Sequence, residues 1–358
     1  MRILFTGGGT GGHIFPIIAI RETLPADCEV RYLGPDGFAK ENLSDIKAKF
    51  ILAGKLYRYF NPMIVLEFFK IFIGIIQSLF YLFAWIPDVV FSKGGYGSFP
   101  VLFVARLYRI PVIIHDSDAV PGLVTKKSAK FAKRIILSFE SAKKYFKPKH
   151  QNKIIVIGNP VRKELLNGNI DEAKAMFKIN SSKPVLLIMG GSQGAEKINE
   201  IIVNALPQFL EIAEIIHMVG EKNFANIEKD AQKFPDYHLY PFLNTEQLRD
   251  ALTIATLVVN RASAGSIFEI AALGKPSILI PLPNSAQNHQ RENAYEFNKA
   301  SGAIVVEQEN LTPNMLLGQI SSLLSDSQRL SEMPQKAKQF YNPQTPELIR
   351  DEILKLVP

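Results

Sequence analysis

Cysteine is almost absent from this chain, since Cys28 is the only one among 358 residues. A single cysteine excludes an internal disulfide and a cysteine-based metal site, and it fits a reducing cytoplasm. The opening run Met1–Phe5 reaches a glycine turn too early for the apolar part of a signal peptide, so we expect a first strand and no export signal. The sequence also lacks an aromatic RNA-binding motif, a zinc knuckle and a basic recognition helix, and we therefore expect no nucleic acid partner.

The composition is that of a large globular protein with an excess of positive charge. Apolar residues make up 47% of the chain and charged residues 21%. A chain of this length exceeds what one core normally supports, so two domains are expected. The formal net charge of +7 favours an anionic partner, either a lipid surface or a phosphorylated substrate.

Short apolar runs alternate with helix-length segments along both halves of the chain, which predicts parallel sheets in an α/β fold. Proline and glycine in Gly158–Arg162 mark the best boundary between the halves. We predict domains at 1–160 and 161–340, with an amphipathic C-terminal helix at about 341–358 packing back on the first domain. The expected strands are Ile3–Phe5, Val30–Leu33, Val89–Phe91, Val112–Ile114, Arg134–Leu137, Ile154–Ile157, Val185–Met189, Ile215–Val219, His238–Pro241, Leu257–Asn260, Ser277–Ile280 and Ala303–Val306.

A glycine-rich turn follows the first strand of each half. The first is Thr6–His13, with the sequence TGGGTGGH, and the second is Gly190–Ala195, with the sequence GGSQGA. Glycine lets the backbone approach a phosphate closely, and the helix that follows offers N–H groups and the positive end of its dipole. Two such turns favour two Rossmann-like, doubly wound domains facing one cleft.

His13 stands where the first glycine turn becomes helix. The turn formally fits the dinucleotide pattern G-x-G-x-x-G, but the second strand ends in Gly34-Pro-Asp36 rather than directly in an acidic residue. An imidazole at this place can accept a proton from a hydroxyl at neutral pH. On position alone, a role as base and a role as helix cap remain equally open.

The segment from Asn260 to Asn293 carries the strongest pattern for ligand binding. Arg261 ends a strand, and Ala264, Gly265 and Ser266 form a small-residue turn that can admit a phosphate. Glu269 lies one helical turn further on, where a carboxylate can hold the two hydroxyls of a ribose. A set of amide and imidazole side chains suited to sugar hydroxyls follows: His289, Gln290 and Asn293.

The segment from Met63 to Trp85 is almost wholly apolar and aromatic. This segment has three possible interpretations: helices packed on the sheet, a peripheral membrane surface, or a true membrane span. The aromatic residues exceed what one buried helix face can use, so we favour peripheral attachment and expect Phe72, Phe80 and Trp85 to face lipid. Lysines that follow in the same half would serve an anionic surface: Lys126, Lys127, Lys130, Lys133, Lys143, Lys144 and Lys147.

The order and spacing of four motifs resemble the MurG family of glycosyltransferases over nearly the whole chain. These motifs are Gly8–His13, Gly158–Arg162, Gly190–Ala195 and Arg261–Asn293. The resemblance implies a GT-B fold and inverting, metal-independent transfer of N-acetylglucosamine from UDP-N-acetylglucosamine to lipid I, a polyprenyl-diphosphate-linked acceptor. It also implies peripheral attachment to the cytoplasmic face of the cell membrane, at its anionic inner surface, with no cofactor.

The resemblance also implies roles for individual residues. Asp118 departs from the family, which usually has an asparagine there, and its carboxylate would repel a diphosphate. No Asp-x-Asp motif occurs around the donor turns. The implied assignments are Thr10, Gly11 and Gly12 lining the cleft, His13 as base, Arg162 and Ser192 toward the donor, Leu243 beside uracil, Ala264, Gly265 and Ser266 on the diphosphate with Arg261 near, Glu269 on ribose, and His289, Gln290 and Asn293 at the donor sugar.

Three other functions remain open from the sequence. A diacylglycerol glycosyltransferase or a UDP-N-acetylglucosamine 2-epimerase would share the fold, and the epimerase would need further acid and base carboxylates. A non-catalytic membrane platform for a partner glycosyltransferase would need neither His13 nor an intact donor site.

Overall fold

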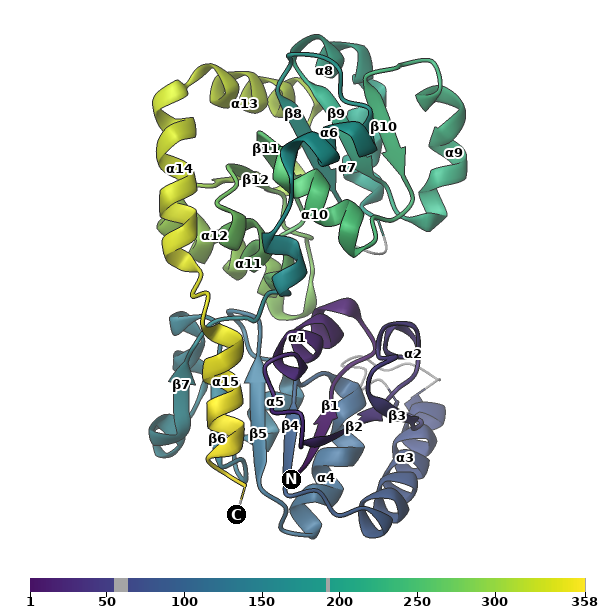
Figure 1. The fold of residues 1–358 in the computed structure, drawn as a ribbon, viewed down its shortest axis with the longest axis vertical. Coiled ribbons are helices and arrows are strands. Elements are labelled where there is room, and N and C mark those ends of the chain that lie inside the picture. Colours follow the sequence, from purple (N-terminus) through teal and green to yellow (C-terminus); the bar gives the residue numbers. More distant parts are fainter. Residues whose placement is uncertain (55–63, 191–193, 358) are drawn as a thin grey trace. The chain divides into compact units, whose positions relative to one another are not determined.

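The computed structural model describes residues 1–54, 64–190 and 194–357, which form two compact units (Figure 1). The N-terminal unit contains residues 1–161 together with 343–358, and the C-terminal unit contains residues 162–342. Each unit is built on its own parallel sheet.

The sheet of the N-terminal unit has seven strands in the order β3-β2-β1-β4-β5-β6-β7. Every strand expected in this half is present, and β3 is an additional one. The strands are β1 (Arg2–Thr6), β2 (Glu29–Gly34), β3 (Lys47–Phe50), β4 (Val89–Ser92), β5 (Val112–Asp116), β6 (Arg134–Leu137) and β7 (Ile154–Val156). The chain order reverses between β1 and β4, and in such sheets ligands bind beyond the carboxyl ends of the strands at that reversal.

Helices cover both faces of this sheet. Ile3 and Phe5 of β1 face one apolar core, while Leu4 between them faces the other. The first core is covered by α1 (Gly11–Arg21), α2 (Phe38–Asn42) and the C-terminal α15 (Thr345–Leu354). The second is covered by α3 (Ile64–Ala84), α4 (Phe99–Leu107) and α5 (Leu123–Ser128). Short 3-10 turns complete the unit at η1 (Tyr96–Ser98), η2 (Glu140–Tyr145) and η3 (Pro148–Lys153).

The sheet of the C-terminal unit has six parallel strands in the order β10-β9-β8-β11-β12-β13. It repeats the reversal of the first sheet, here between β8 and β11. The strands are β8 (Val185–Met189), β9 (Glu214–Met218), β10 (Tyr237–Tyr240), β11 (Leu257–Asn260), β12 (Ser277–Leu279) and β13 (Ile304–Val305). The two sheets therefore give two doubly wound α/β domains, as the sequence predicts.

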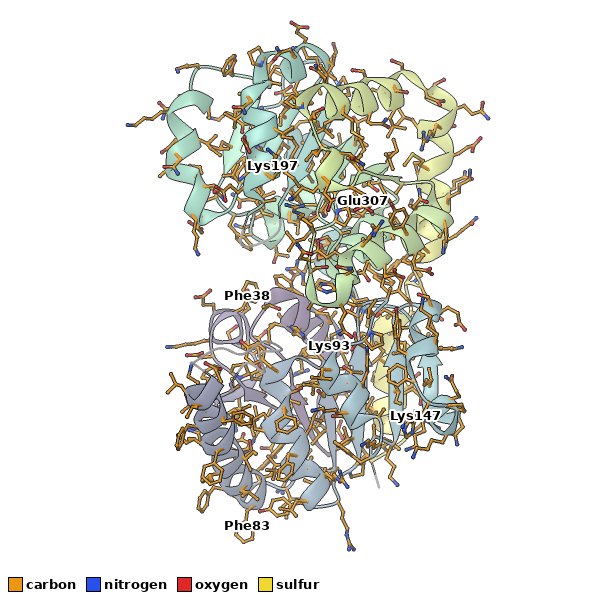
Figure 2. The ribbon with its side chains drawn as sticks, turned by 180° about the vertical axis from the view of Figure 1, so that it is seen from behind. Phe38, Phe83, Lys93, Lys147, Lys197 and Glu307 are labelled. Carbon is orange, nitrogen blue, oxygen red and sulfur yellow. The ribbon has the colours of Figure 1, made fainter. Side chains whose placement is uncertain are left out.

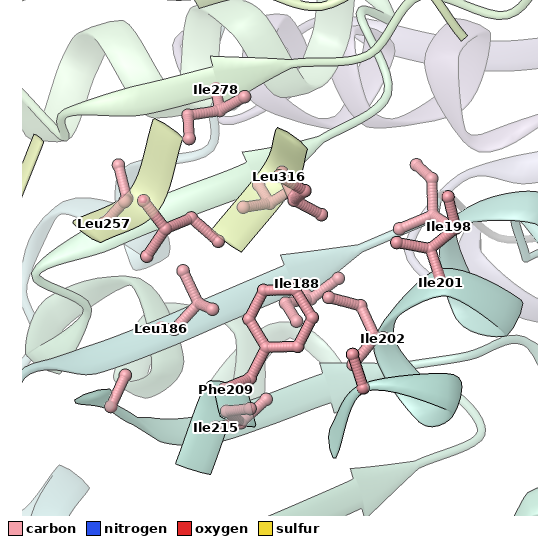
Figure 3. Packing of buried hydrophobic residues seen from close by; sticks show 14 of the residues in the cluster. Leu186, Ile188, Ile198, Ile201, Ile202, Phe209, Ile215, Leu257, Ile278 and Leu316 are labelled. Carbon is pink, nitrogen blue, oxygen red and sulfur yellow. The ribbon is translucent and has the colours of Figure 1, made fainter. Parts of the chain in front are cut away.

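The core on one face of this second sheet joins Leu186 and Ile188 of β8 to Phe209 and Leu316 from the covering helices (Figure 3). These side chains are almost completely buried, and their packing holds β8 and the turn after it in place. The helices of the unit are α6 (Ile170–Phe177), α7 (Glu196–Asn204), α8 (Leu206–Ile212), α9 (Glu221–Ala231), α10 (Thr245–Ile254), α11 (Ala264–Leu273), α12 (His289–Ser301), α13 (Pro313–Ser325) and α14 (Ser327–Phe340), with 3-10 turns η4 (Lys163–Leu166), η5 (Ala286–Asn288) and η6 (Gln308–Asn310).

Helix α3 has its polar and apolar faces in unusual positions. Its buried stripe recurs every three or four residues and contains Glu67, Gly74, Ser78 and Leu82. A side chain at Gly74 would collide with the Leu52 carbonyl oxygen, so only glycine allows this close approach to the segment after β3. The opposite face is exposed and almost wholly apolar.

Most of the aromatic side chains of this segment point outward, but the expectation that Trp85 faces lipid is wrong. Phe72 and Phe80 are 61% and 73% exposed, whereas Trp85 is only 5% exposed and belongs to the core. The Arg31 guanidinium lies over the Trp85 ring, 4.3 Å from its centroid. Trp85 continues the buried stripe three residues after Leu82, which places it on the inner face of the helix.

Among the described residues, one helix is long and apolar enough to cross a membrane. It runs from Val65 to Ala84, with a mean hydropathy of 1.7 and 28% of that window buried. A helix buried in a soluble core would hide most of this surface, so α3 is not a core helix of the usual kind.

Candidate functional sites

In the N-terminal unit, the first glycine turn leads from β1 into the start of α1. Thr10 is the N-cap residue, and Gly11 and Gly12 begin the helix. A side chain at Gly12 would meet nothing within 4 Å, so the space beside the first helical turn is open. The first N–H groups of a helix have no intrahelical acceptor, and this turn therefore offers donors to an anion or to sugar oxygens.

The His13 imidazole is half-buried between two glycines. A side chain at Gly8 or at Gly95 would approach the ring to 2.9 Å, so both glycines are needed for the ring to lie where it does. Its Nδ1 lies 2.9 Å from the Thr10 hydroxyl oxygen. Burial, followed by the positive charge of Lys93, lowers the pKa of His13 to about 4, while the Asp118 carboxylate acts in the opposite direction. His13 is therefore uncharged at neutral pH.

Lys93, labelled in Figure 2, directly follows the carboxyl end of β4, and its Cβ lies 3.4 Å from the position that a side chain at Gly7 of the same turn would occupy. The Lys93 side chain is only 3% exposed. Its ammonium nitrogen lies 2.6 Å from His115 Nδ1, 2.6 Å from the Ser117 hydroxyl and 3.2 Å from Asn159 Oδ1. These three acceptors match the three hydrogens of an ammonium group.

Asp116 and Asp118 have Asp-x-Asp spacing after β5, but the Asp116 carboxylate is used within the loop. It accepts hydrogen bonds from the backbone N–H groups of Asp118 and Gly122, at 3.2 and 2.9 Å. Burial and the neighbouring Asp118 raise the pKa of Asp116. Within residues 1–54, 64–190 and 194–357 there is no group of three acidic, histidine or cysteine side chains that could hold a metal ion.

In the C-terminal unit, the small-residue turn lies at the start of α11, as the sequence suggests. Ser263 is the N-cap residue, and its hydroxyl accepts a hydrogen bond from the Ser266 N–H at 3.3 Å. Ala264 and Gly265 are the first helical residues, and a side chain at Gly265 would meet nothing within 4 Å. The start of α11 thus repeats the open glycine found at the start of α1, which suits a diphosphate.

Glu269 of α11 and the buried Arg162 form a largely buried ion pair. An Arg162 nitrogen lies 3.6 Å from a Glu269 carboxylate oxygen, and a second nitrogen donates to the Thr245 hydroxyl at 2.6 Å. Burial raises the pKa of Glu269, while the charge of Arg162 opposes that rise. Leu243 is also buried, close in sequence to Thr245. The structure thus joins two of the predicted donor residues, Arg162 and Glu269, through direct contact.

The remaining predicted donor residues have contacts that hold the loops around the start of α11. Arg261 donates to the carbonyl oxygens of Ile280 and Pro281 and to the Gln308 side chain. Asn293 is fully buried and donates to the Ala262 carbonyl oxygen at 3.2 Å.

Gln290 and His289 lie at the start of α12. The Gln290 side chain accepts from the Leu282 N–H at 2.9 Å, and His289 Nδ1 lies 2.8 Å from the Ala286 carbonyl oxygen. Both remain partly exposed. Ser192, the other residue expected at the donor, lies outside the described residues.

Sequence reasoning missed Lys93 and its partners. The sequence offered one signal, because Lys93 comes shortly after the apolar run Val89–Phe91 and is followed by Gly94 and Gly95, a second glycine turn in the same half. A charged residue between a buried strand and a glycine pair lies at the carboxyl end of a parallel strand, where ligands bind in such sheets. Ser117 and Asn159 could not have been joined to it, since they are close only in the folded unit.

Comparison with known families places both units in one group of enzymes. Residues 3–137 match the glycosyltransferase family 28 N-terminal domain, and residues 185–346 match the glycosyltransferase family 28 C-terminal domain. The protein of Legionella pneumophila strain Paris called UDP-N-acetylglucosamine–N-acetylmuramyl-(pentapeptide) pyrophosphoryl-undecaprenol N-acetylglucosamine transferase is 40% identical over 327 residues, covering 90% of this chain and 88% of that protein.

Solved structures agree with this placement. The crystal structure of Acinetobacter baumannii MurG is similar with a TM-score of 0.75 and 28% identity, covering 99% of both chains. The UDP-GlcNAc 2-epimerase of Neisseria meningitidis, bound to UDP-GlcNAc, has a TM-score of 0.68 at 16% identity, covering 99% of this chain and all of that one. The second similarity concerns the fold alone.

Proposed function

Since the chain belongs to glycosyltransferase family 28, we propose that it transfers N-acetylglucosamine from UDP-N-acetylglucosamine to lipid I, the polyprenyl-diphosphate-linked acceptor, and so forms lipid II for peptidoglycan. The observation that carries this proposal is the 40% identity, across 90% of the chain, to a transferase named for that reaction. The open space beside Gly12 at the start of α1, and beside Gly265 at the start of α11, supports it chemically, because a phosphate or sugar can approach the free N–H groups there.

The C-terminal unit holds the donor in this proposal. The N–H groups at the start of α11 stabilise the charge that grows on the leaving diphosphate, with no need for a protein-bound cation. Glu269 accepts hydrogen bonds from the ribose hydroxyls, and Arg162 keeps this buried carboxylate charged and oriented. Gln290 and His289 face the donor sugar from the start of α12.

The N-terminal unit supplies the base. The hydroxyl of the acceptor sugar attacks the anomeric carbon of the donor from the side opposite UDP, the bond from that carbon to the diphosphate breaks, and the anomeric configuration inverts. His13 Nε2 accepts the hydroxyl proton, while Nδ1–H donates to the Thr10 hydroxyl and fixes the ring orientation. An imidazole that is uncharged at neutral pH is ready for this role.

Two measurements separate this function from its alternatives. Calorimetry with UDP should show binding, because the donor site is proposed to be complete in this chain; the absence of binding would favour a non-catalytic platform. UDP release should require acceptor, and formation of an epimer from UDP-N-acetylglucosamine without acceptor would favour an epimerase.

We also propose that the N-terminal unit attaches peripherally to the anionic cytoplasmic face of the cell membrane through α3. The outward face of α3 carries Phe68, Phe72, Phe80 and Phe83, and each of these is at least 59% exposed. Phe83 is labelled in Figure 2. Exposed aromatic groups on one helix face suit the headgroup region of a bilayer. The buried stripe with Glu67 binds the helix to its own domain along its length, which favours lying on the membrane over crossing it.

Neighbouring elements extend this surface. Helices α3, α4 and α5 cover the same face of the sheet, and the outward residues Phe103 and Leu107 of α4 are also exposed. Exposed lysines follow on α5 and the segment after it, among them Lys127 and Lys130. An apolar surface followed by lysines on one side of a unit combines insertion with attraction to anionic lipid.

Serine in place of both Phe72 and Phe80 tests the membrane proposal. We expect the melting temperature and the turnover of a soluble acceptor analogue to stay nearly unchanged, because both rings are exposed. Binding to vesicles rich in anionic lipid should fall at least about tenfold, since each removed ring takes roughly 1.5–3 kcal/mol of burial with it. Cosedimentation measures the loss.

A core variant provides the matched control. Trp85→Ser should destabilise the N-terminal unit by roughly 3–5 kcal/mol, because the indole is packed in the core. Glutamine at Lys127 and Lys130 should make the remaining vesicle binding less sensitive to salt. A folded, active double mutant that binds vesicles like wild type would refute attachment through α3, and retention in the membrane after high-salt and carbonate washing would favour a span.

A further inference from the structure

A buried cluster of charged and polar groups lies under the first glycine turn. The proposed reaction assigns a role only to His13, at the edge of this cluster. His13 and Lys93 are neighbours in this cluster: their Cβ atoms lie 3.3 and 3.4 Å from the position that a side chain at Gly7 would occupy. The Lys93 backbone N–H also donates to the Thr6 carbonyl oxygen at 2.9 Å, which fixes β4 against the turn. The Cβ atoms of Lys93 and His13 therefore lie close together, and main-chain and side-chain contacts hold Lys93 in that place.

The contacts of Lys93 favour its charged form, whereas burial acts against it. His115 Nε2 lies 3.0 Å from the Gly158 carbonyl oxygen, which can only accept, so the ring hydrogen is on Nε2. His115 Nδ1 is then an acceptor and takes a hydrogen bond from Lys93. The Asn159 carbonyl oxygen accepts from Lys93 and from the Ser117 hydroxyl. A site with three acceptors around the nitrogen favours the ammonium form of lysine.

We propose that Lys93 is a positioning residue for sugar transfer, because its buried ammonium group keeps the neighbouring His13 imidazole in the uncharged form that accepts a proton. The inference rests on the proposed role of His13 as base. A second positive charge close to the buried Lys93 ammonium group is disfavoured by repulsion, so protonation of the imidazole before the acceptor arrives is disfavoured.

Other titratable groups around the turn oppose the effect of the Lys93 charge on His13 or leave it unchanged. Asp116 and Asp118, after β5, carry the negative charges that balance the ammonium group. Burial raises the pKa of the Tyr32 phenol on β2, so this group is uncharged in the same pH range. Asp118 is half-exposed and is the group whose charge opposes Lys93 at His13.

The pH range in which Lys93 affects His13 follows from the pKa of Lys93 and the ordinary pKa of an imidazole. Burial lowers the pKa of Lys93 to about 7, so its charge is present below that pH. An ordinary imidazole would become protonated in this same range, near pH 6.5. The charge on Lys93 therefore acts where it is needed, and it extends the range of uncharged His13 toward acid.

The test is a direct titration of His13 in the whole protein. The chain has six histidines, and the His13 signal can be assigned in carbon-13 labelled protein by its loss in a His13 variant. In Lys93→Met the pKa of His13 should rise by about 0.5 to 1.5 units. In Asp118→Asn it should fall, because the opposing carboxylate is gone. Lys93→Gln, which keeps polar atoms in the site, serves if the methionine variant does not fold.

Ser117→Ala provides the control for a purely structural role. It removes one acceptor of Lys93 but leaves the charge, so the pKa of His13 should move by less than in either Lys93 variant. An unchanged or lowered pKa of His13 in Lys93→Met or Lys93→Gln would overturn the inference.

The pH profile of kcat/KM connects the titration to the reaction. Its acidic limb should move to higher pH in the Lys93 variants by the same amount as the His13 titration. A displaced His13 titration with an unmoved limb would contradict His13 as base and, with it, the role of Lys93 in transfer. Loss of activity that is equal at all pH values, with no displaced titration, would reduce Lys93 to a structural residue.

Discussion

Alanine in place of His13 is expected to lower kcat by roughly two to four orders of magnitude while UDP binding stays nearly intact. The reason is that a general base acts on the attacking hydroxyl, whereas the proposed UDP site is built entirely from the C-terminal unit. Initial rates with saturating donor and acceptor measure the effect, and calorimetry with UDP measures the donor affinity.

The fold of the variant needs its own check, because His13 is packed between Gly8 and Gly95. An unchanged melting temperature would assign the lost rate to chemistry. Thr10→Val is the matched variant, since it removes the hydroxyl near Nδ1 without removing the ring, and it should cost far less than His13→Ala. Turnover near the wild-type rate in His13→Ala would reduce His13 to a helix-capping residue.

The second large effect is expected at Glu269. Glu269→Ala should raise the donor KM at least about tenfold with a much smaller change in kcat, because the carboxylate holds the ribose in the ground state and the transition state alike. The Glu269→Ala protein should also be less stable by roughly 1–3 kcal/mol, because the buried Arg162 loses its carboxylate partner. Thermal unfolding and donor titrations measure the two effects.

A surface carboxylate on the same unit is the control. Glu200, paired with Lys197 on the exposed side of α7, should leave both KM and melting temperature nearly unchanged when replaced by alanine. Addition of UDP should recover less stability in Glu269→Ala than in wild type, because the ligand binds the folded variant more weakly. A wild-type donor KM in a folded Glu269→Ala protein would remove Glu269 from the donor site.

The sequence predicted the sheets well because most of the central strands are buried on both faces. Such strands are short apolar runs bounded by glycine or proline, as at Val185–Met189, and they are recognisable without knowledge of their neighbours. The strand β3 escaped this reasoning. Its sequence KAKF lies at the edge of the sheet and is largely exposed, so it carries no apolar run.

Helix α3 shows where composition misleads. The buried stripe of this helix contains a glutamate, a glycine and a serine, while the phenylalanines point outward. Counting aromatics therefore predicted the exposed surface but could not separate Trp85 from Phe80 and Phe83. Helical spacing places Trp85 inside and Phe80 and Phe83 outside only if Glu67, Gly74 and Ser78 are taken to lie on the buried face.

The candidate sites were predictable in part for a related reason. Glycine turns and the start of α11 depend on local sequence, so the positions of Thr10, Gly12 and Gly265 at helix starts were predictable, whereas their contact with substrate stays a prediction. The pairing of Arg162 with Glu269 and the cluster around Lys93 depend on contacts across 107 and 22 to 66 positions of the chain. No spacing rule reaches that far without the fold.

Transfer of labelled sugar to a lipid acceptor tests the central claim most directly. Radiolabelled UDP-N-acetylglucosamine would be incubated with the purified protein and a short-chain lipid I analogue, and the products separated by extraction. We expect one lipid-linked disaccharide, with inverted configuration at the transferred sugar, for each UDP released. UDP binding without label in the lipid fraction, or label in a free epimer instead, would contradict it.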